Sequence, residues 1–474
     1  MNDYKLTSGM EIHVELKTKS KIFSSSLNNY DSPANTNVNV IDLAYPGVLP
    51  TINKEVIELA LKAALILNCN INKRMHFDRK NYFYPDNPKN YQITQFRTPI
   101  GVDGFIEIEV NGEVRKIGIS DIHIEEDTCK SVHYNNASLL NFNRAGVPLV
   151  EIVTKPDVKT SEEAVLFLEK LREMLFYADI SDVKIEQGSM RVDANVSVSK
   201  TDALGTKIEV KNIGSISNVG EVLKSEYDRQ VSLLESGDTL REETRRLDES
   251  SKSTVLMRVK EVGNDYRYFP EPDIPFIELD DEYIENVRDS IPLLPAAMRN
   301  IYIASGINPV NANKIIQNRS IAEYLNGFLD ANINLVIASN ILLGDISAYL
   351  NKTNKNILDT TLTSERFINL VNKLNSGDIN NKVFKDLLTD IVEKDLSIDE
   401  IIKSSGIEKM DDNTISSIIV DIISKNPDAV NDFKNGNDRS IKFLMGMVMK
   451  ETKGSADPVL ANRMLIEAIN KLRI

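Results

Sequence analysis

Hydrophobic and polar residues alternate strictly near the start of the chain. In the segment Gly9–Leu16 every second residue is apolar, and the residues between them are Glu11, His13 and Glu15. Successive side chains of a strand point to opposite faces, so this pattern predicts a half-buried strand with two carboxylates and an imidazole on one surface. Charged residues also occur on a strand simply because one face meets solvent. This segment alone leaves both explanations open.

Further along the chain, three segments share this one-sided polarity. Their polar faces carry Asp121, His123 and Glu125; Arg191, Asp193 and Asn195; and Lys207, Glu209 and Lys211. A fourth segment, Leu149–Val153, has a single carboxylate, Glu151, in an otherwise apolar run. Because a buried carboxylate without a partner is costly, we expect Glu151 to face a cation or a hydrogen-bond donor.

The first 290 or so residues combine alternating segments with a few helical ones. Helices are expected where apolar residues follow helical spacing behind a capping residue, at 51–67, 160–177 and 219–236. Strands are expected at 105–110, 117–125, 149–154, 183–186, 190–198 and 207–212. Strands joined by hairpins and interrupted by a few helices predict an α+β domain with a mainly antiparallel sheet.

The pattern changes at Pro270–Pro295, where five prolines fall within 26 residues. Prolines at this density mark a boundary or a rigid connector. The segments that follow have helical periodicity, at 296–304, 311–317, 320–329 and 335–350, and a second break falls near 404–412. We therefore predict three domains: a sheet domain at 1–292, a helical domain at 293–405, and a small helical tail at 406–474.

Composition narrows the class of protein. The 474 residues contain two cysteines, which exclude a disulfide framework and a four-thiolate zinc site. No apolar run is long enough to cross a bilayer and the first residues lead into no signal peptide, so a cytoplasmic protein is expected. The net charge of −14 argues against nucleic-acid binding over the whole surface. However, Arg439–Ile474 has seven basic and three acidic residues, which suits a local RNA contact or ordinary solubilisation equally.

Several carboxylates on one sheet face repel each other unless a cation lies between them. Oxygen ligands with one imidazole favour magnesium or a similar ion over zinc. The chain has neither a phosphate-binding P-loop nor a dinucleotide fingerprint. Acids that hold magnesium are therefore the available means of binding nucleotide phosphates, although a solvated sheet face explains the pattern as well.

Aromatic and basic residues are interleaved in Arg79–Tyr91, which contains four aromatic rings, three cations and two prolines. Stacking rings among cations suit a nucleobase or an unpaired nucleic-acid end. A proline-pinned loop whose rings pack onto the sheet is the simpler alternative. Asp265–Asp273 allows the same two interpretations, and Arg144–Pro148 predicts a rigid turn before Glu151.

These segments, taken together and in order, resemble a known family. The matching blocks are 9–16, 43–50, 80–95, 123–130, 144–157, 188–197, 209–215, 265–273 and 450–454. They resemble the B subunit of the tRNA-dependent amidotransferases that convert Glu-tRNA(Gln) to Gln-tRNA(Gln) and Asp-tRNA(Asn) to Asn-tRNA(Asn). The resemblance covers essentially the whole chain, and the chain length without an inserted domain favours the bacterial type.

The resemblance implies a carbon–nitrogen ligase. In that family the B subunit has a cradle-like α+β domain, a helical domain and a tail that contacts tRNA, and it uses ATP and Mg²⁺ to phosphorylate the side-chain carboxylate of the misacylated amino acid. An amidase A subunit supplies ammonia from glutamine, and a small C subunit clamps the two larger subunits together. We expect the same partners here, with misacylated tRNA as substrate.

The resemblance also implies site residues, carried over position by position. The expected metal ligands are Glu11, His13, Glu125, Glu126, Glu151, Asp193 and Glu209. The expected catalytic residues among them are Glu11, Glu125, Glu126, Asp193 and Glu209. The expected cofactor-binding residues are Lys80, Tyr82, Tyr84, Arg144 and Lys211.

Some positions depart from the family pattern. Thr128 and Cys129 stand where Ala and Gly are expected, and Ser24–Ser26 lies where some members carry a cysteine zinc motif. None of the departures removes an expected acid. Two rival functions remain to be distinguished: a metal-dependent phosphohydrolase or nuclease that uses the same acids, and a non-catalytic RNA-binding scaffold whose acids solvate a sheet.

Overall fold

The computed structural model describes residues 3–259, 265–405, 412–452, 456 and 458–471. The chain divides into two compact units, Met1–Leu294 and Pro295–Ile474, which we call the sheet unit and the helical unit. The division lies at the end of the proline-rich segment. Among the described residues, no helix is long and apolar enough to cross a bilayer.

The sheet unit is built on nine strands in the order β14-β13-β12-β11-β1-β10-β7-β6-β2. Their bounds are β1 Lys5–Glu15, β2 Asn70–Ile71, β6 Gly101–Val110, β7 Glu113–Glu126, β10 Pro148–Thr154, β11 Met190–Ser199, β12 Ile208–Lys211, β13 Glu243–Asp248 and β14 Ser253–Val259. Neighbours are antiparallel except for the β12–β13 pair. The expected α+β class with a mainly antiparallel sheet is confirmed.

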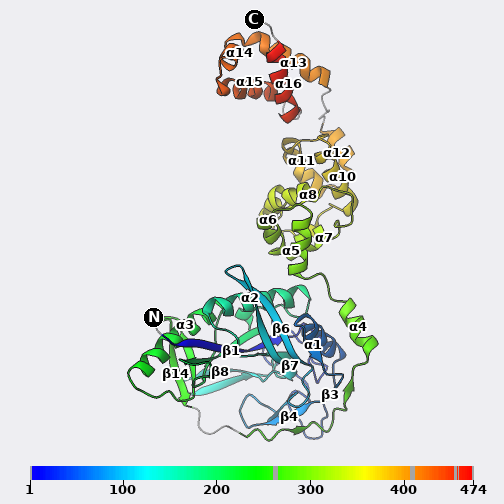
Figure 1. The fold of residues 1–474 in the computed structure, drawn as a ribbon. Coiled ribbons are helices and arrows are strands. Elements are labelled where there is room, and N and C mark those ends of the chain that lie inside the picture. The colour runs from blue at the N-terminus through cyan, green and yellow to red at the C-terminus, as the bar shows by residue number, and fades with distance from the viewer. Residues whose placement is uncertain (1–2, 260–264, 406–411, 453–455, 457, 472–474) are drawn as a thin grey trace. The chain divides into compact units, whose positions relative to one another are not determined.

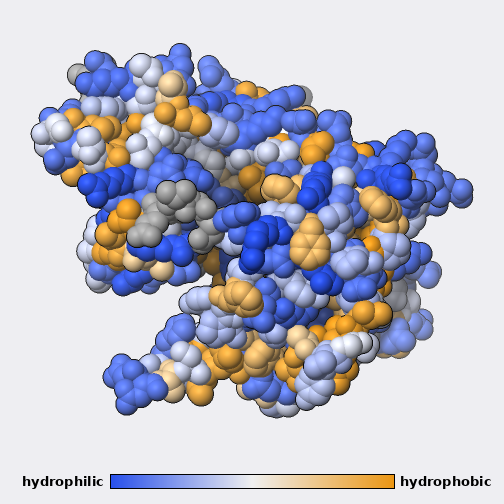
Figure 2. All heavy atoms as spheres, turned by 90° about the horizontal axis from the view of Figure 1, so that it is seen from below, coloured by the Kyte–Doolittle hydropathy of each residue, from blue (hydrophilic) through white to orange (hydrophobic). Residues whose placement is uncertain are grey.

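Three smaller sheets complete the strands of this unit. They are β15-β4-β5, β16-β3 and β8-β9. Their bounds are β3 Arg74–Met75, β4 Asp78–Asn81, β5 Tyr91–Thr94, β8 Lys130–Tyr134, β9 Ala137–Asn141, β15 Phe269–Pro270 and β16 Ile277–Glu278. Exposed hydrophobic side chains lie among hydrophilic ones on the face seen from below, to which the β4 region belongs (Figures 1 and 2).

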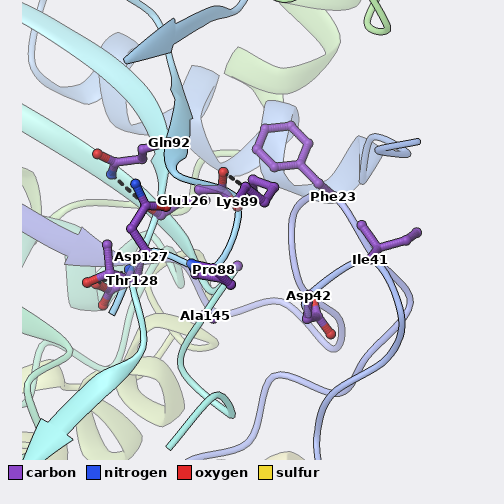
Figure 3. A pocket seen from close by; sticks show the side chains of 12 residues that line it. Phe23, Ile41, Asp42, Pro88, Lys89, Gln92, Glu126, Asp127, Thr128 and Ala145 are labelled. Atoms are coloured by element: carbon purple, nitrogen blue, oxygen red, sulfur yellow. Dashed lines mark hydrogen bonds and ion pairs between the residues drawn. The ribbon is translucent and has the colours of Figure 1, made fainter. Parts of the chain in front are cut away.

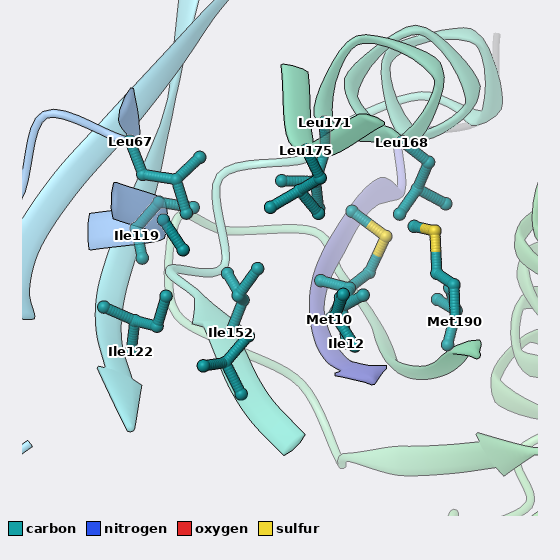
Figure 4. Packing of buried hydrophobic residues seen from close by; sticks show 14 of the residues in the cluster. Met10, Ile12, Leu67, Ile119, Ile122, Ile152, Leu168, Leu171, Leu175 and Met190 are labelled. Atoms are coloured by element: carbon teal, nitrogen blue, oxygen red, sulfur yellow. The ribbon is translucent and has the colours of Figure 1, made fainter. Parts of the chain in front are cut away.

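Helices pack on the apolar face of the large sheet. They are α1 Lys54–Ile66, α2 Ser161–Tyr177 and α3 Ile216–Glu235, and a short helix α4 Asp281–Asp289 contacts α1 (Figure 1). Met10 and Ile12 of β1 lie in one cluster with Leu168 and Leu171 of α2 (Figure 4). Because side chains alternate along β1, this packing leaves Glu11 and His13 on the opposite face of the sheet.

Local sequence signals account for most of these elements. The side chain of Asn53 accepts a hydrogen bond from the backbone of Glu55, and Thr160 accepts one from Glu163, so both expected helix caps are present. The strand expected at 183–186 is wrong: residues Ile185–Gln187 form a 3₁₀ helix. The backbone N–H of Lys184 donates to the hydroxyl of Ser189, and the backbone N–H of Ser189 donates to the carbonyl of Lys184. These hydrogen bonds close a turn and occupy backbone groups that a neighbouring strand would otherwise pair with.

The helical unit contains α-helices, a 3₁₀ helix at Ile357–Asp359 and no strand among its described residues, as the periodicity predicts. The α-helices are α5 Pro295–Ala304, α6 Pro309–Ile316, α7 Arg319–Asn326, α8 Leu335–Ile341, α9 Ser347–Thr353, α10 Ser364–Asn375, α11 Asn381–Glu393, α12 Ile398–Ser404, α13 Asp412–Lys425, α14 Pro427–Lys434, α15 Asp438–Glu451 and α16 Pro458–Lys471. The single helix expected at 335–350 is instead α8, a π-helical turn and α9. The backbone of Gly344 is non-helical at this kink.

The last four helices have an apolar cluster of their own. It includes Ile415 and Ile419 of α13, Leu444 of α15 and Leu465 of α16, all at most 2% exposed. Part of the expected tail, residues 406–411, lies outside the described residues, as do Lys453 and Gly454 of the matching block at 450–454.

Candidate metal centre

The polar face of the large sheet gathers acids from five strands. At its middle, β1 pairs with β10 on one side and β11 on the other, which sets His13 opposite Glu151 and Glu11 opposite Asp193. Side chains that lie directly opposite each other on neighbouring strands are within contact distance. The register therefore assembles groups that are more than 130 residues apart in the chain.

The first group consists of His13, Glu125 and Glu151 and is called the His13 cluster. Nε2 of His13 lies 3.3 Å from Oε1 of Glu125 and 3.4 Å from Oε2 of Glu151. Burial alone lowers the pKa of His13, but its bonds to the two carboxylates outweigh this and raise the pKa to about 10. In the absence of a metal ion, the protonated imidazole thus balances one of the two negative charges.

A second imidazole, that of His123, contacts a carboxylate of the His13 cluster. Nε2 of His123 lies 3.0 Å from Oε2 of Glu151, and its Nδ1 lies 2.9 Å from Oδ1 of Asp121. Burial acts to raise the pKa of Glu151, but the bonds to His123 and His13 prevail and hold it well below its ordinary value. Glu151 therefore has the partners that a mostly buried carboxylate requires.

The second group consists of Glu11, Asp193 and Glu209 and is called the Glu11 cluster. Asn195 donates a hydrogen bond of 2.9 Å to Glu11. Nζ of Lys211 lies 2.7 Å from Asp193 and 3.0 Å from Glu209. Burial acts to lower the pKa of Lys211, but the larger combined effect of Asp193 and Glu209 raises the pKa above its ordinary value. The ammonium therefore stays charged. Lys211 balances part of the charge of this cluster.

Both clusters fit a divalent cation. In each, one ligand atom from every residue lies within 4.8 Å of the others. The donors are carboxylate oxygens with a single imidazole, a set that suits Mg²⁺ or Mn²⁺. The His13 cluster offers its donors without a competing lysine bond, whereas the Glu11 cluster shares its carboxylates with Lys211.

Glu126 does not join either group among the described residues. Its carboxylate pairs with Lys89 and accepts a 2.9 Å hydrogen bond from the backbone of Ile93, because it follows Glu125 directly and points the other way (Figure 3). It lines a small cavity of about 20 Å³, enough for one water molecule. The expected ligand role of Glu126 stays a prediction that this geometry does not favour.

Arg144 contacts Asp127 and Thr128, two residues that line the same cavity. It donates bonds of 2.9 Å to the carbonyls of Thr128 and Cys129, and its Nε lies 3.5 Å from Asp127. Asp127 also receives a 2.7 Å bond from Arg191. Arg144 thus fixes the chain just after Glu125 and Glu126, and its predicted contact with a cofactor remains untested.

The aromatic segment lies next to the His13 cluster. Nζ of Lys80 lies 5.1 Å from the ring centre of Tyr266, whose ring also contacts Tyr82. Burial lowers the pKa of Lys80, but the charges of Glu125 and Glu151 contribute to a net increase. Lys80 and Tyr82 are therefore near the candidate metal ligands, while Tyr84 is 56% exposed.

A pair of stacked rings in this region, Phe96 and Tyr268, is not predicted from the sequence pattern. Tyr266 and Tyr268 belong to the aromatic and basic segment Asp265–Asp273, but the pattern does not predict that Tyr268 packs on Phe96. Their rings are parallel within 8° with centres 4.2 Å apart. Phe96 lies just after the segment Arg79–Tyr91. The pair becomes visible only when the structure brings this region next to Asp265–Asp273.

Two family models match most of the chain, and full-length relatives match all of it. The model of the GatB/GatE catalytic domain matches residues 6–285, and the model of the GatB domain matches residues 323–469. The B subunit of the aspartyl/glutamyl-tRNA(Asn/Gln) amidotransferase of Geobacillus thermodenitrificans (strain NG80-2) is 46% identical over 474 residues, 99% of this chain and 100% of the relative. The corresponding protein of Bacillus cereus (strain B4264) is 46% identical over 467 residues, covering 98% of each chain.

The chain therefore carries a GatB/GatE catalytic domain followed by a GatB domain. At this identity and coverage, the chain belongs to the family of aspartyl/glutamyl-tRNA(Asn/Gln) amidotransferase B subunits.

Proposed function

We propose that this chain is the kinase and tRNA-binding subunit of a tRNA-dependent amidotransferase that forms Gln-tRNA(Gln), Asn-tRNA(Asn) or both. The observation that carries the proposal is the pair of carboxylate clusters on one sheet face, in a chain that matches the B subunits over its full length. Such an enzyme replaces a side-chain carboxylate by an amide, and it is a carbon–nitrogen ligase.

The reaction needs the carboxylate to be activated before ammonia can replace one of its oxygens. An oxygen of the Glu or Asp side chain attacks the γ-phosphorus of ATP, ADP leaves, and an acyl phosphate results. Ammonia then attacks the acyl carbon and inorganic phosphate leaves. Mg²⁺, when bound, offsets the negative charge of the ATP phosphates and of the attacking carboxylate.

Residues of this chain take distinct parts in that chemistry. His13, Glu125 and Glu151 are the proposed ligands of one ion, held in place by the His123–Glu151 bond. Glu11, Asp193 and Glu209 would hold a second ion, and Lys211 beside them is the proposed cation for a phosphate group. Lys80, held charged beside Glu125 and Glu151, orients the anionic side chain of the aminoacyl end.

The proposed partners follow from the same family. The relatives are named as B subunits, so each works with other subunits. We propose an amidase A subunit as the source of ammonia, a small C subunit, and misacylated tRNA bound by the sheet unit and by the basic end of the helical unit. ATP is the proposed phosphate donor.

One assay separates this function from its rivals. The chain assembled with A and C subunits of a relative should form amidated tRNA from Glu-tRNA(Gln) or Asp-tRNA(Asn) only when ATP, Mg²⁺ and glutamine are all present. A phosphohydrolase or nuclease would consume ATP or RNA without misacylated tRNA and form no amide. For an RNA-binding scaffold, Glu11→Ala would leave the binding of Mn²⁺ unchanged, whereas the proposed function requires that binding to weaken.

A further inference from the structure

Phe96 and Tyr268 stack on each other, and Tyr268 also contacts Tyr266, the ring that Lys80 lies over. Phe96 and Tyr268 are parallel within 8°, with ring centres 4.2 Å apart, although they are separated by more than 170 residues in the chain. Phe96 is 60% exposed while Tyr268 is half-buried. The pair therefore forms a short stack with an open outer end.

The stack is held in place by a buried carboxylate. Asp78 is fully buried and accepts hydrogen bonds of 3.0 and 3.1 Å from the backbone of Phe96 and Arg97. Nη1 of Arg97 donates to Asp78 at 2.6 Å, and its Nη2 donates to the carbonyl of Tyr268 at 3.2 Å. A partly exposed arginine thus ties the two halves of the stack together.

The same segment is anchored to the strand that carries a candidate metal ligand. The side chain of Gln95 accepts a 3.0 Å bond from the backbone of Ile124, next to Glu125. A row of rings connects the stack inward, since Tyr268 contacts Tyr266 and Lys80 lies over the ring of Tyr266. The Phe96–Tyr268 stack is therefore linked through Tyr266 to Lys80, and through Gln95 to the strand that carries Glu125.

Phe96 differs from a singly exposed ring because it is stacked on a second ring and lies in a row of aromatic and basic side chains. Any nucleobase can stack on such a ring, and cations beside the ring attract the phosphates of the nucleic acid. Two basic side chains lie along the row: Lys80, and Arg97, which is 43% exposed although it pairs with Asp78. By contrast, small-molecule pockets enclose most of their ligand. An open platform is better suited to the flexible end of a nucleic acid than to the adenine of ATP.

We propose that the Phe96–Tyr268 stack binds the terminal adenine of the misacylated tRNA, which places the aminoacyl group over the His13 cluster. This rests on the proposed function, because it needs an aminoacylated tRNA as substrate. The base continues the stack on the open face of Phe96, and its ribose and amino acid extend along the row toward Lys80. Because both tRNAs end in the same adenine, the contact serves tRNA(Gln) and tRNA(Asn) alike.

The test uses the complete complex with its A and C subunits and compares Phe96→Leu with Phe96→Tyr. Leucine keeps an apolar side chain but cannot stack, so the KM for misacylated tRNA should rise about 5- to 150-fold, the range of one base–aromatic stack. Tyrosine should restore most of the affinity. The KM for ATP and the hydrolysis of glutamine should stay within about twofold of wild type.

A matched control is Phe276→Leu, because Phe276 is also an exposed ring, at 54%, but lies against Arg74 and His76 instead of Tyr268. Its KM for tRNA should equal that of wild type. As a direct readout, 2-aminopurine in place of the terminal adenine should lose fluorescence on binding wild type and keep it on binding Phe96→Leu.

Three results would overturn the proposal: a KM for tRNA that Phe96→Leu leaves unchanged, a rise in the KM for ATP that equals or exceeds the rise for tRNA, or equal effects of Phe96→Leu and Phe276→Leu. The proposed function fails separately. If the wild-type complex forms no acyl phosphate, that function is wrong, whereas a wild type that forms it with an unaffected Phe96→Leu removes only the stacking site.

Discussion

Nε2 of His13 lies 3.4 Å from Oε2 of Glu151, across the register pair that joins the two central strands β1 and β10. The same Oε2 atom is 3.0 Å from Nε2 of His123 on the next strand, β7. One carboxylate therefore positions two imidazoles from strands more than 100 residues apart. His123 is the outer partner of the proposed ligand Glu151, and outer partners of this kind orient metal ligands and tune their affinity.

Removal of that carboxylate charge should weaken metal binding. Glu151→Gln keeps the shape of the side chain but removes the charge of a proposed ligand and the anionic partner of both imidazoles, so we expect the affinity of the assembled complex for Mn²⁺ to fall at least about tenfold. Isothermal titration measures this directly. Glu113→Gln is the control, since Glu113 is an exposed residue at the opposite end of β7. Equal affinities for the two variants would contradict a metal site at His13.

Lys211 should compete with a cation for the Glu11 cluster. Lys211→Met leaves Asp193 and Glu209 without the ammonium that lies 2.7 and 3.0 Å away, so their mutual repulsion should lower Tm in the presence of a chelator. Mg²⁺ or Mn²⁺ should restore much of that loss by binding the freed carboxylates. Thermal unfolding with and without the ion gives the comparison. A Tm that responds to the ion no more in Lys211→Met than in wild type would exclude the cluster as a cation site.

A buried ion network on α3 should make the sheet unit sensitive to acid. Glu226 is fully buried and is bonded to Arg229 at 2.8 Å, with Arg245 at 3.3 Å. Burial acts to raise its pKa, but the bonds to Arg229, Thr254 and Gln230 outweigh this and lower it below its ordinary value near 4.5. Loss of one partner from such a pair costs about 3 kcal/mol, and we expect this decrease in the unfolding free energy for Glu226→Gln at pH 7.

The dependence on pH follows from the sign of that shift. Because the folded state binds this proton less readily than the unfolded state, the ionised carboxylate stabilises the protein above pH 4.5 and loses this effect as the pH falls further. The difference between wild type and Glu226→Gln, measured by urea unfolding, should therefore shrink below pH 4.5. Glu285→Gln on α4, where the side chain is 62% exposed, should differ little from wild type at any pH. A constant difference for Glu226→Gln would contradict the shift.

The last four helices should carry part of the tRNA affinity. They have their own apolar cluster, so deletion of residues 412–474 removes a packed unit and leaves the other helices intact. The deletion also removes the basic segment Arg439–Ile474, and we expect weaker tRNA binding with a shallower dependence on salt concentration. Filter binding at several salt concentrations measures both. Unchanged affinity would show that these helices do not contact tRNA.

Much of the candidate site could be predicted because strand periodicity is local. Alternation in Gly9–Leu16 correctly set Glu11 and His13 on one face and the core residues on the other. The same rule grouped Asp121 with His123, which are in contact. Helix caps at Asn53 and Thr160 were equally readable, because a cap depends on a few neighbouring residues.

Long-range pairing could not be predicted in the same way. Nothing in the order of the chain sets β1 between β10 and β11, and therefore nothing separates the acids into a His13 cluster and a Glu11 cluster. The orientation of Glu126 toward Lys89 depends on a loop that packs from outside the sheet. The stack of Phe96 on Tyr268 likewise arises only when two distant segments meet.

The most direct test is the transfer of phosphate itself, measured without glutamine. The assembled complex, given Glu-tRNA(Gln) and ATP labelled at the γ-phosphate, should release ADP and form an acyl phosphate on the misacylated tRNA. Glu125→Gln, which removes the charge of a ligand that is 4% exposed in the His13 cluster, should abolish that product while complex assembly and glutamine hydrolysis by the A subunit stay near wild type. Full acyl-phosphate formation by Glu125→Gln would contradict the assignment of this sheet face as the kinase site.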